Sequence, residues 1–195
     1  LTLYASTSKD DTKFLDSLLG FSNLKTDIFN KNGLHALRGK RNGKQIFCAI
    51  KLRSTFKKDQ FNLAPIGKIN LGYTQLDNYT ETKSEGLALK YDKQEIQTRI
   101  VSIGMMFDDT IGFKNSTIKP NGKLEYSRDF SPSSDATYRY LSETTEYTKS
   151  IDQDAMNARA NIGFDLITEN GFSVMTIYER NQSDNAHSDT LYLGF

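Results

Sequence analysis

The chain holds very few of the residues that build disulfide frameworks and metal sites. Its 195 residues include one cysteine, Cys48, and two histidines, His35 and His187. A single cysteine excludes an intramolecular disulfide and a multi-cysteine metal centre. The histidines have no partner at zinc-ligand spacing, so both are interpreted as solvated loop residues. No cofactor and no metal is expected.

An excess of either charge is also missing. Lysine and arginine together number 25, and aspartate and glutamate number 24, which gives a formal net charge of +1. Proteins that bind nucleic acid usually carry a clear basic excess. The balance therefore argues against a nucleic-acid partner.

Long hydrophobic runs are absent as well. The longest nearly apolar run covers residues 100–107, which is far short of the ~20 residues that a spanning helix needs. The mean hydropathy is −0.56. These values exclude a helical membrane protein. They do not exclude a membrane β-barrel, because its strands expose only every second residue to lipid.

Apolar and polar residues alternate with period two through most of the chain, which indicates β-strands rather than helices. The clearest alternation covers residues 157–166. The last seven residues follow the same pattern and place Leu191, Leu193 and Phe195 on one side of a strand. A soluble domain rarely ends with its final residue in an apolar stripe, because chain ends usually fray into water.

The expected strands are separated by connections of two lengths. Residues 23–43 and 77–94 are long and polar, and we expect them to be mostly loop, with a short strand at 86–90. Residues 57–60 and 169–171 are short turns, the second with the hairpin signal Asn-Gly. Long loops at one end and short turns at the other are typical of outer-membrane barrels.

Two further segments need a specific interpretation. Residues 118–126 contain Asn121-Gly122, but the alternation passes through this pair unbroken, so we expect one continuous strand. Pro120 must then lie at an edge, at a bulge or near the strand start. Residues 137–145 are interpreted as a weaker strand.

Alternation alone fits two opposite arrangements. In a soluble sandwich the apolar face points to a core, whereas in a membrane barrel it points to lipid and the polar face lines the lumen. The pattern of connections favours the barrel. The residues then expected to face lipid are Ile69, Leu71, Tyr73, Val101, Ile103, Phe107, Leu124, Tyr126, Ile162, Phe164, Val174 and Tyr178. The polar residues expected to face the lumen are Lys51, Arg53, Lys68, Lys123, Glu125, Arg159 and Asp165.

The ordered set of these segments resembles the C-terminal β-barrel translocator domain of bacterial autotransporters, which belong to type V secretion. The resemblance covers about residues 15–195. It is carried, in order, by residues 66–73, 86–94, 100–107, 118–126, 157–164, 172–178 and 191–195.

The resemblance implies an antiparallel, up-and-down, transmembrane β-barrel in the bacterial outer membrane. The family barrel has twelve strands, of which about ten are expected in residues 1–195, so the first strands and the passenger would lie upstream. The function implied is export of an N-terminal passenger to the cell surface, without catalysis. Leu191, Leu193 and Phe195 resemble the signal that the barrel-assembly machinery recognises, by strand addition at a sheet edge.

Other functions remain open at this point. A general outer-membrane diffusion pore would have the same alternation. An outer-membrane hydrolase could use His187, which is near Asp184 and Asp189 in the sequence. A soluble β-sandwich that binds a partner would require the apolar face to be covered by a second layer.

Overall fold

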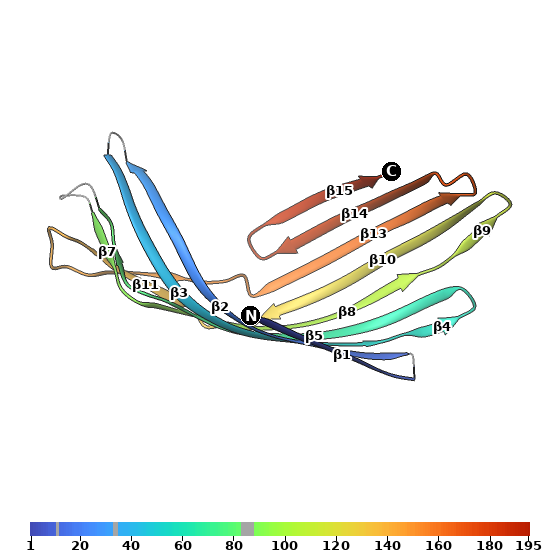
Figure 1. Cartoon of the computed structure of the whole chain (residues 1–195), viewed down its shortest axis with the longest axis horizontal. Helices are drawn as coiled ribbons and strands as arrows, with labels where there is room; N and C mark the ends of the chain where they lie inside the picture. Colours follow the sequence, from blue (N-terminus) through green and yellow to red (C-terminus); the bar gives the residue numbers. More distant parts are fainter. Residues whose placement is uncertain (11, 33–34, 83–87) are drawn as a thin grey trace.

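The computed structural model describes residues 1–10, 12–32, 35–82 and 88–195. All regular secondary structure in these residues is β-strand (Figure 1). The described residues form no helix that could span a membrane. The strands that follow one another across the main sheet are β1 (Thr2–Lys9), β2 (Lys13–Asn32), β3 (His35–Ser54), β5 (Phe61–Leu76), β8 (Gln94–Asp108), β10 (Ser116–Asp129), β13 (Met156–Thr168), β14 (Ser173–Ser183) and β15 (His187–Gly194).

Each of these strands pairs antiparallel with the next one along the chain, so the sheet is an up-and-down meander. This confirms the all-β antiparallel fold. The sheet is strongly curved, and β1 and β15 form its two edges (Figure 1). Within the described residues β1 does not pair with β15, so the sheet is open.

The short connections agree largely with the sequence. The turn between β13 and β14 closes at Gly171, which has a φ of 81° and whose N–H donates to the Thr168 carbonyl at 3.0 Å. The predicted turn at residues 57–60 is tighter than expected, because β4 (Phe56–Lys58) extends the pairing into it. In the same way β9 (Ile111–Phe113) shortens the connection between β8 and β10.

The strand through Asn121 and Gly122 is continuous, as predicted. On one side of β10, pairing with β9 ends at Ile118 and pairing with β8 begins at Asn121. Pro120 lies in this gap, and its carbonyl accepts the Asp109 N–H at 3.0 Å on the same side. In an antiparallel strand the N–H and C=O of one residue point to the same side. The N–H that Pro120 lacks would therefore point into this gap, where neither β8 nor β9 is paired with β10.

The prediction that residues 23–43 form a loop is wrong. β2 and β3 pair without interruption from Lys13 opposite Ser54 to Asn32 opposite His35. The outer half of this hairpin lacks an apolar stripe, so a search for alternation misses it, although its backbone groups are satisfied by the ladder. The two histidines, predicted in loops, are the first residues of β3 and β15.

The long connections between β5 and β8 and between β10 and β13 also contain strands. They form a four-stranded sheet, called the outer sheet here, from β6 (Tyr79–Thr80), β7 (Leu89–Tyr91), β11 (Ser134–Tyr140) and β12 (Tyr147–Ile151). The strand predicted at residues 137–145 is β11, which begins and ends earlier than predicted, at Ser134 and Tyr140. The strand β12 was not predicted. The strand predicted at 86–90 is β7, while residues 86 and 87 lie outside the described residues.

The outer sheet continues the main sheet. Leu76 lies opposite Gln94 in β5 and β8, and in the same register Tyr79 lies opposite Tyr91 in β6 and β7. Asp129 lies opposite Ile100, and in unchanged register Tyr138 lies opposite Tyr91. The strands therefore pass through short interruptions and extend beyond the main sheet, on the same side as the end of β2 and the start of β3 (Figure 1).

Candidate functional site

The cross-strand register sorts the predicted residues onto two faces. Ile69 lies opposite Val101, Ile103 opposite Tyr126, and Ile162 opposite Tyr178. Since paired residues share a face and alternate residues return to it, all residues predicted to face lipid lie on one side, called the apolar face. Their exposure runs from 37% at Tyr73 to 64% at Ile103, with Phe107 and Val174 half-buried.

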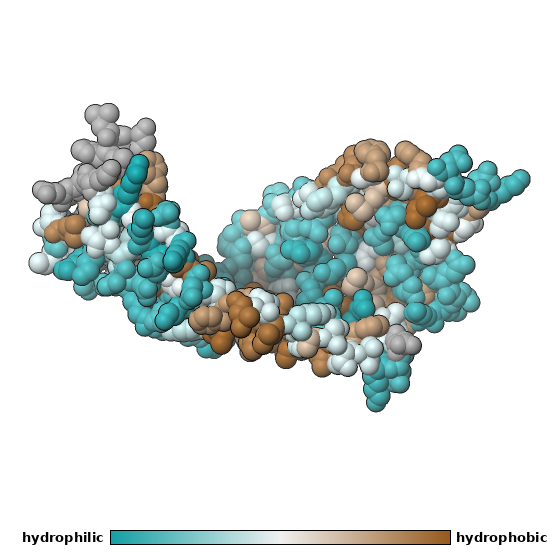
Figure 2. Space-filling model, viewed as in Figure 1, coloured by the Kyte–Doolittle hydropathy of each residue, from teal (hydrophilic) through white to brown (hydrophobic). Residues whose placement is uncertain are grey.

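The apolar face is uncovered. Figure 2 shows hydrophobic residues gathered along the lower, convex side of the curved sheet. The described residues form a single curved layer (Figure 1), with no second layer packed beneath it. A soluble sandwich needs such a layer, so this alternative does not match the fold.

The predicted polar residues all lie on the other side, called the polar face. Lys51 lies opposite Lys68, Lys68 opposite Ser102, and Glu125 opposite Arg159. This side is concave, and the curvature crowds its side chains together. Ser102 and Ile66 on this face are buried, although the sheet carries no second layer.

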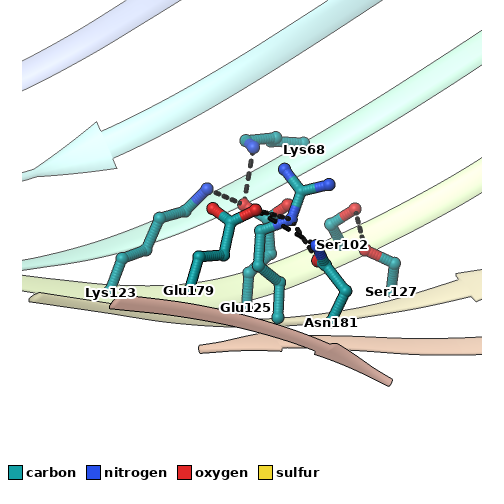
Figure 3. A network of polar contacts seen from close by, with 8 residues as sticks. Lys68, Ser102, Lys123, Glu125, Ser127, Glu179 and Asn181 are labelled. Atoms are coloured by element: carbon teal, nitrogen blue, oxygen red, sulfur yellow. Dashed lines mark hydrogen bonds and ion pairs between the residues drawn. The ribbon is translucent and has the colours of Figure 1, made fainter. Parts of the chain in front are cut away.

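Glu125 is the centre of a network on the polar face (Figure 3). Its Oε2 lies 2.5 Å from Nζ of Lys68 and 2.7 Å from Nζ of Lys123. The Glu125 side chain is 11% exposed, and the two lysine side chains are 25% and 19% exposed. One carboxylate thus neutralises part of the charge of two cations in a crowded, partly desolvated environment.

A second group of polar contacts adjoins the first. Nε of Arg159 donates to Oδ1 of Asn181 at 2.6 Å and lies 4.0 Å from Oε1 of Glu179. Nδ2 of Asn181 donates to that same carboxylate at 3.1 Å. Ser102 and Ser127 share a hydrogen bond of 2.8 Å between their Oγ atoms (Figure 3).

The sequence identified Lys68, Lys123, Glu125 and Arg159 but missed the partners of Arg159 on β14. Glu179 and Asn181 lie on the same face of β14 as Ile177. Because Ile177 is apolar, the sequence does not identify this face as polar. Alternate residues of a strand share a face, so continuing the alternation beyond Ile177 identifies both partners.

Three of the predicted lumen residues stand apart from the network. The guanidinium of Arg53 lies over the Phe14 ring, 4.3 Å from its centroid. Lys51 and Asp165 form no ion pair within 4.0 Å among the described residues. Charge pairing across the face is therefore confined to the strip from β5 to β14.

The predicted assembly signal lies at the free edge of the sheet. In β15, Leu191 lies opposite Tyr178 and Leu193 opposite Thr176, so both belong to the apolar face. They are exposed, and Phe195, directly after the strand, is 89% exposed. Among the described strands β15 pairs with β14 alone.

The surroundings of His187 do not form a catalytic group. The carboxylate of Asp189 accepts the Tyr178 hydroxyl at 2.6 Å and lies 3.6 Å from Nη1 of Arg180. The Asp184 carboxylate accepts the Met156 N–H at 3.0 Å. Both aspartates near His187 in the sequence thus have other partners. No cluster of metal-ligating side chains occurs in the part of the chain that the structure describes.

Comparison with protein families gives a match over most of the chain. Residues 1–179 match the family model described as the autotransporter beta-domain. Comparison with curated proteins finds no match.

Proposed function

The chain belongs to the autotransporter β-domain family, and from this premise we propose which of its surfaces meet lipid, the export route and the assembly machinery. The family resides in the bacterial outer membrane, where the β-domain translocates a passenger and carries no catalysis. Its fold is a transmembrane β-barrel, so the curved antiparallel sheet is barrel wall. We assign residues 1–195 to this one domain, because β15 pairs with β14 in the same sheet.

The apolar face is the surface that contacts outer-membrane lipid. Exposed Ile103, Leu124 and Ile162 on a single-layered sheet support this assignment, since the same area in water would favour aggregation. Contact with lipid removes this tendency to aggregate. The antiparallel pairing supplies the backbone hydrogen bonds that lipid cannot provide. The same assignment extends to the rest of the lipid-facing set predicted from the sequence.

The polar face lines the lumen through which the passenger is exported. The support is its charge: Lys51, Arg53, Lys68, Lys123, Glu125, Arg159 and Asp165 all lie on it. Charged side chains facing hydrocarbon would be costly, whereas a water-filled lumen solvates them. The charges there also set the ionic selectivity of the pore.

The terminal strand carries the signal for the barrel-assembly machinery. Three features support this: Leu191, Leu193 and Phe195 are exposed, the two leucines share the apolar face, and β15 has a free edge within the described residues. A free edge presents backbone donors and acceptors to an added strand, and the alternating side chains supply specificity. The machinery is therefore expected to pair with β15.

The observation that carries the proposal is the sorting of charged and apolar residues onto opposite faces of one curved layer. It is tested with the precursor that carries the passenger, produced in a Gram-negative host. We expect passenger accessible to external protease, and a β-domain whose gel migration changes on heating. A β-domain recovered from the aqueous fraction would contradict the proposal, and surface passenger is not expected of a general diffusion pore.

A further inference from the structure

Tyrosine side chains form a continuous row across the outer sheet. Tyr79, Tyr91, Tyr138 and Tyr147 occupy directly opposite positions on β6, β7, β11 and β12. Their ring centroids are 4.7 Å, 5.5 Å and 5.8 Å apart in that order. We call this row the tyrosine ladder.

The tyrosine ladder lies on the concave side of the wall. A Cβ placed on Gly39 would come within 2.8 Å of the Tyr79 ring, so this ring covers the face toward which Gly39 points. Along the unbroken strand β3, Gly39 shares a face with Phe47 and Lys51. The ladder is therefore a continuation of the polar face toward the end with the long connections, which in outer-membrane barrels is the extracellular end.

Arg41 holds the inner end of the ladder in place. Its guanidinium lies 5.4 Å from the Tyr79 centroid and donates to the carbonyls of Asp77 and Asp92, both at 2.9 Å. These carbonyls belong to the interruptions between the main sheet and the outer sheet. Nη1 of Arg41 also donates to Oε1 of Gln94 at 3.2 Å. One side chain thus satisfies groups that the broken ladders leave free, and it ties β3 to the segments that lead into β6 and out of β7.

Buried polar contacts extend this anchor to β11. Nε2 of Gln94 donates to Oγ of Ser134 at 3.0 Å, and that hydroxyl donates to the Glu95 carbonyl at 3.0 Å. Both side chains are buried, as are Leu37 and Ala88 nearby in the outer part of the wall. Together with Glu81 they make up five of the eight buried side chains among the described residues, which is unexpected for loops that serve only as connections.

The stacked geometry decides which ligands the ladder can take. Within the row the ring faces lie against neighbouring rings, and the Arg41 guanidinium lies over Tyr79, so these inner faces leave little room for a sugar ring to stack. What remains toward the lumen are ring edges and hydroxyls. Burial raises the pKa of the Tyr79 and Tyr91 phenols, so both stay protonated at neutral pH. Apolar edges beside hydroxyl donors suit a peptide backbone and its side chains without demanding one sequence.

We propose that the tyrosine ladder is a contact surface for the extended passenger chain as it leaves the pore. The inference rests on the proposed lumenal role of the polar face. The occupant follows from position: an exported polypeptide must cross a row that lies across the strands on the inner side of the extracellular wall. A rigid row would offer repeated weak contacts that limit backsliding of the unfolded chain.

The test places a photo-reactive amino acid at Tyr138 in the precursor with its passenger. The matched control is Arg139, the next residue of β11, whose side chain points to the opposite face. Pulse-labelled precursor is irradiated during export, and assembly is checked by heat-modifiable migration. We expect a cross-link to the passenger from position 138 that is severalfold stronger than from position 139. Equal cross-linking at both positions, or cross-linking at 138 only to lipopolysaccharide, would overturn the proposal.

A second measurement separates contact from a purely structural role. Tyr91→Phe and Tyr138→Phe keep the stacking but remove the hydroxyls, whereas Tyr91→Leu and Tyr138→Leu remove both. We expect the passenger to reach the surface severalfold more slowly in the leucine variants, at unchanged amounts of assembled barrel. Unchanged export rates in leucine variants that still assemble would refute the proposed role of the tyrosine ladder and leave the proposed function of the domain intact. Failure of the unsubstituted precursor to export its passenger would instead refute the proposed function.

Discussion

Lys68 on β5 and Glu125 on β10 form an ion pair of 2.5 Å across the strand that separates them. The intervening strand β8 places Ser102 opposite Lys68 and Gly104 opposite Glu125. Small residues at these positions leave room for the lysine to reach the carboxylate. The pair therefore depends on the absence of large side chains at these two positions of β8 as well as on the two charges (Figure 3).

Glu125→Gln is expected to destabilise the barrel, because it leaves Lys68 and Lys123 close together without their shared anion. The two lysines are partly exposed, so we expect a cost of about 1–2 kcal/mol rather than the larger penalty of a fully buried pair. Unfolding in lipid by denaturant measures it. Glu169→Gln, in the exposed β13–β14 turn, is the matched control and should change little. Equal effects at the two positions would show that the network does not contribute to stability.

Gly104→Ala is expected to cost about 1–3 kcal/mol, because an added Cβ would lie 2.5 Å from the Leu124 carbonyl and 3.0 Å from Cγ1 of Ile66. The carbonyl belongs to the paired backbone of β10 and cannot move without weakening the ladder. Gly67→Ala is the control, since its added Cβ meets nothing within 4 Å. The ratio of folded to unfolded β-domain in lipid, followed by heat-modifiable migration, compares them. A neutral Gly104→Ala variant would mean that β8 has room for a side chain.

The main sheet was predictable from sequence because one stripe on each strand is apolar. In β13, Ile162 and Phe164 alternate with polar or small neighbours, and the turn signal at Gly171 fixes the register between β13 and β14. A slip of one residue would turn every apolar side chain to the polar face. Strand existence and the sorting of Lys68 and Glu125 onto one face therefore followed from period two.

The outer part of the wall was not predictable in the same way. The β2–β3 hairpin between Lys25 and Gly43 has polar residues on both faces, so no stripe identifies it, and its pairing depends on partners distant in the sequence. The tyrosine ladder brings Tyr79 and Tyr147 into one row through three cross-strand pairs. Such pairs between separate loops have no local sequence signal.

Ile162→Arg is expected to cost about 2–4 kcal/mol in lipid, whereas Asn161→Arg should cost little. Ile162 is 61% exposed on the apolar face, where a cation would meet hydrocarbon. Asn161 lies on the polar face directly opposite Glu179, which can pair with the new charge. Unfolding of both variants in the same lipid provides the measurement. Equal costs, or a larger cost at residue 161, would mean that the faces are inverted.

Phe195→Ala is expected to lower the amount of β-domain assembled in the outer membrane far more than it lowers the stability of barrel already folded. Phe195 follows the strand and is almost fully exposed, so its ring contributes little packing to the folded sheet. Its proposed role is recognition at the free edge of β15, which is needed only during assembly. Tyr192→Ala is the control, because it removes another aromatic ring from β15 on the opposite face. Outer-membrane levels and the denaturation midpoint of refolded protein are measured for both variants. Normal outer-membrane levels of Phe195→Ala, or the same loss with Tyr192→Ala, would show that the terminal ring is not what the machinery reads.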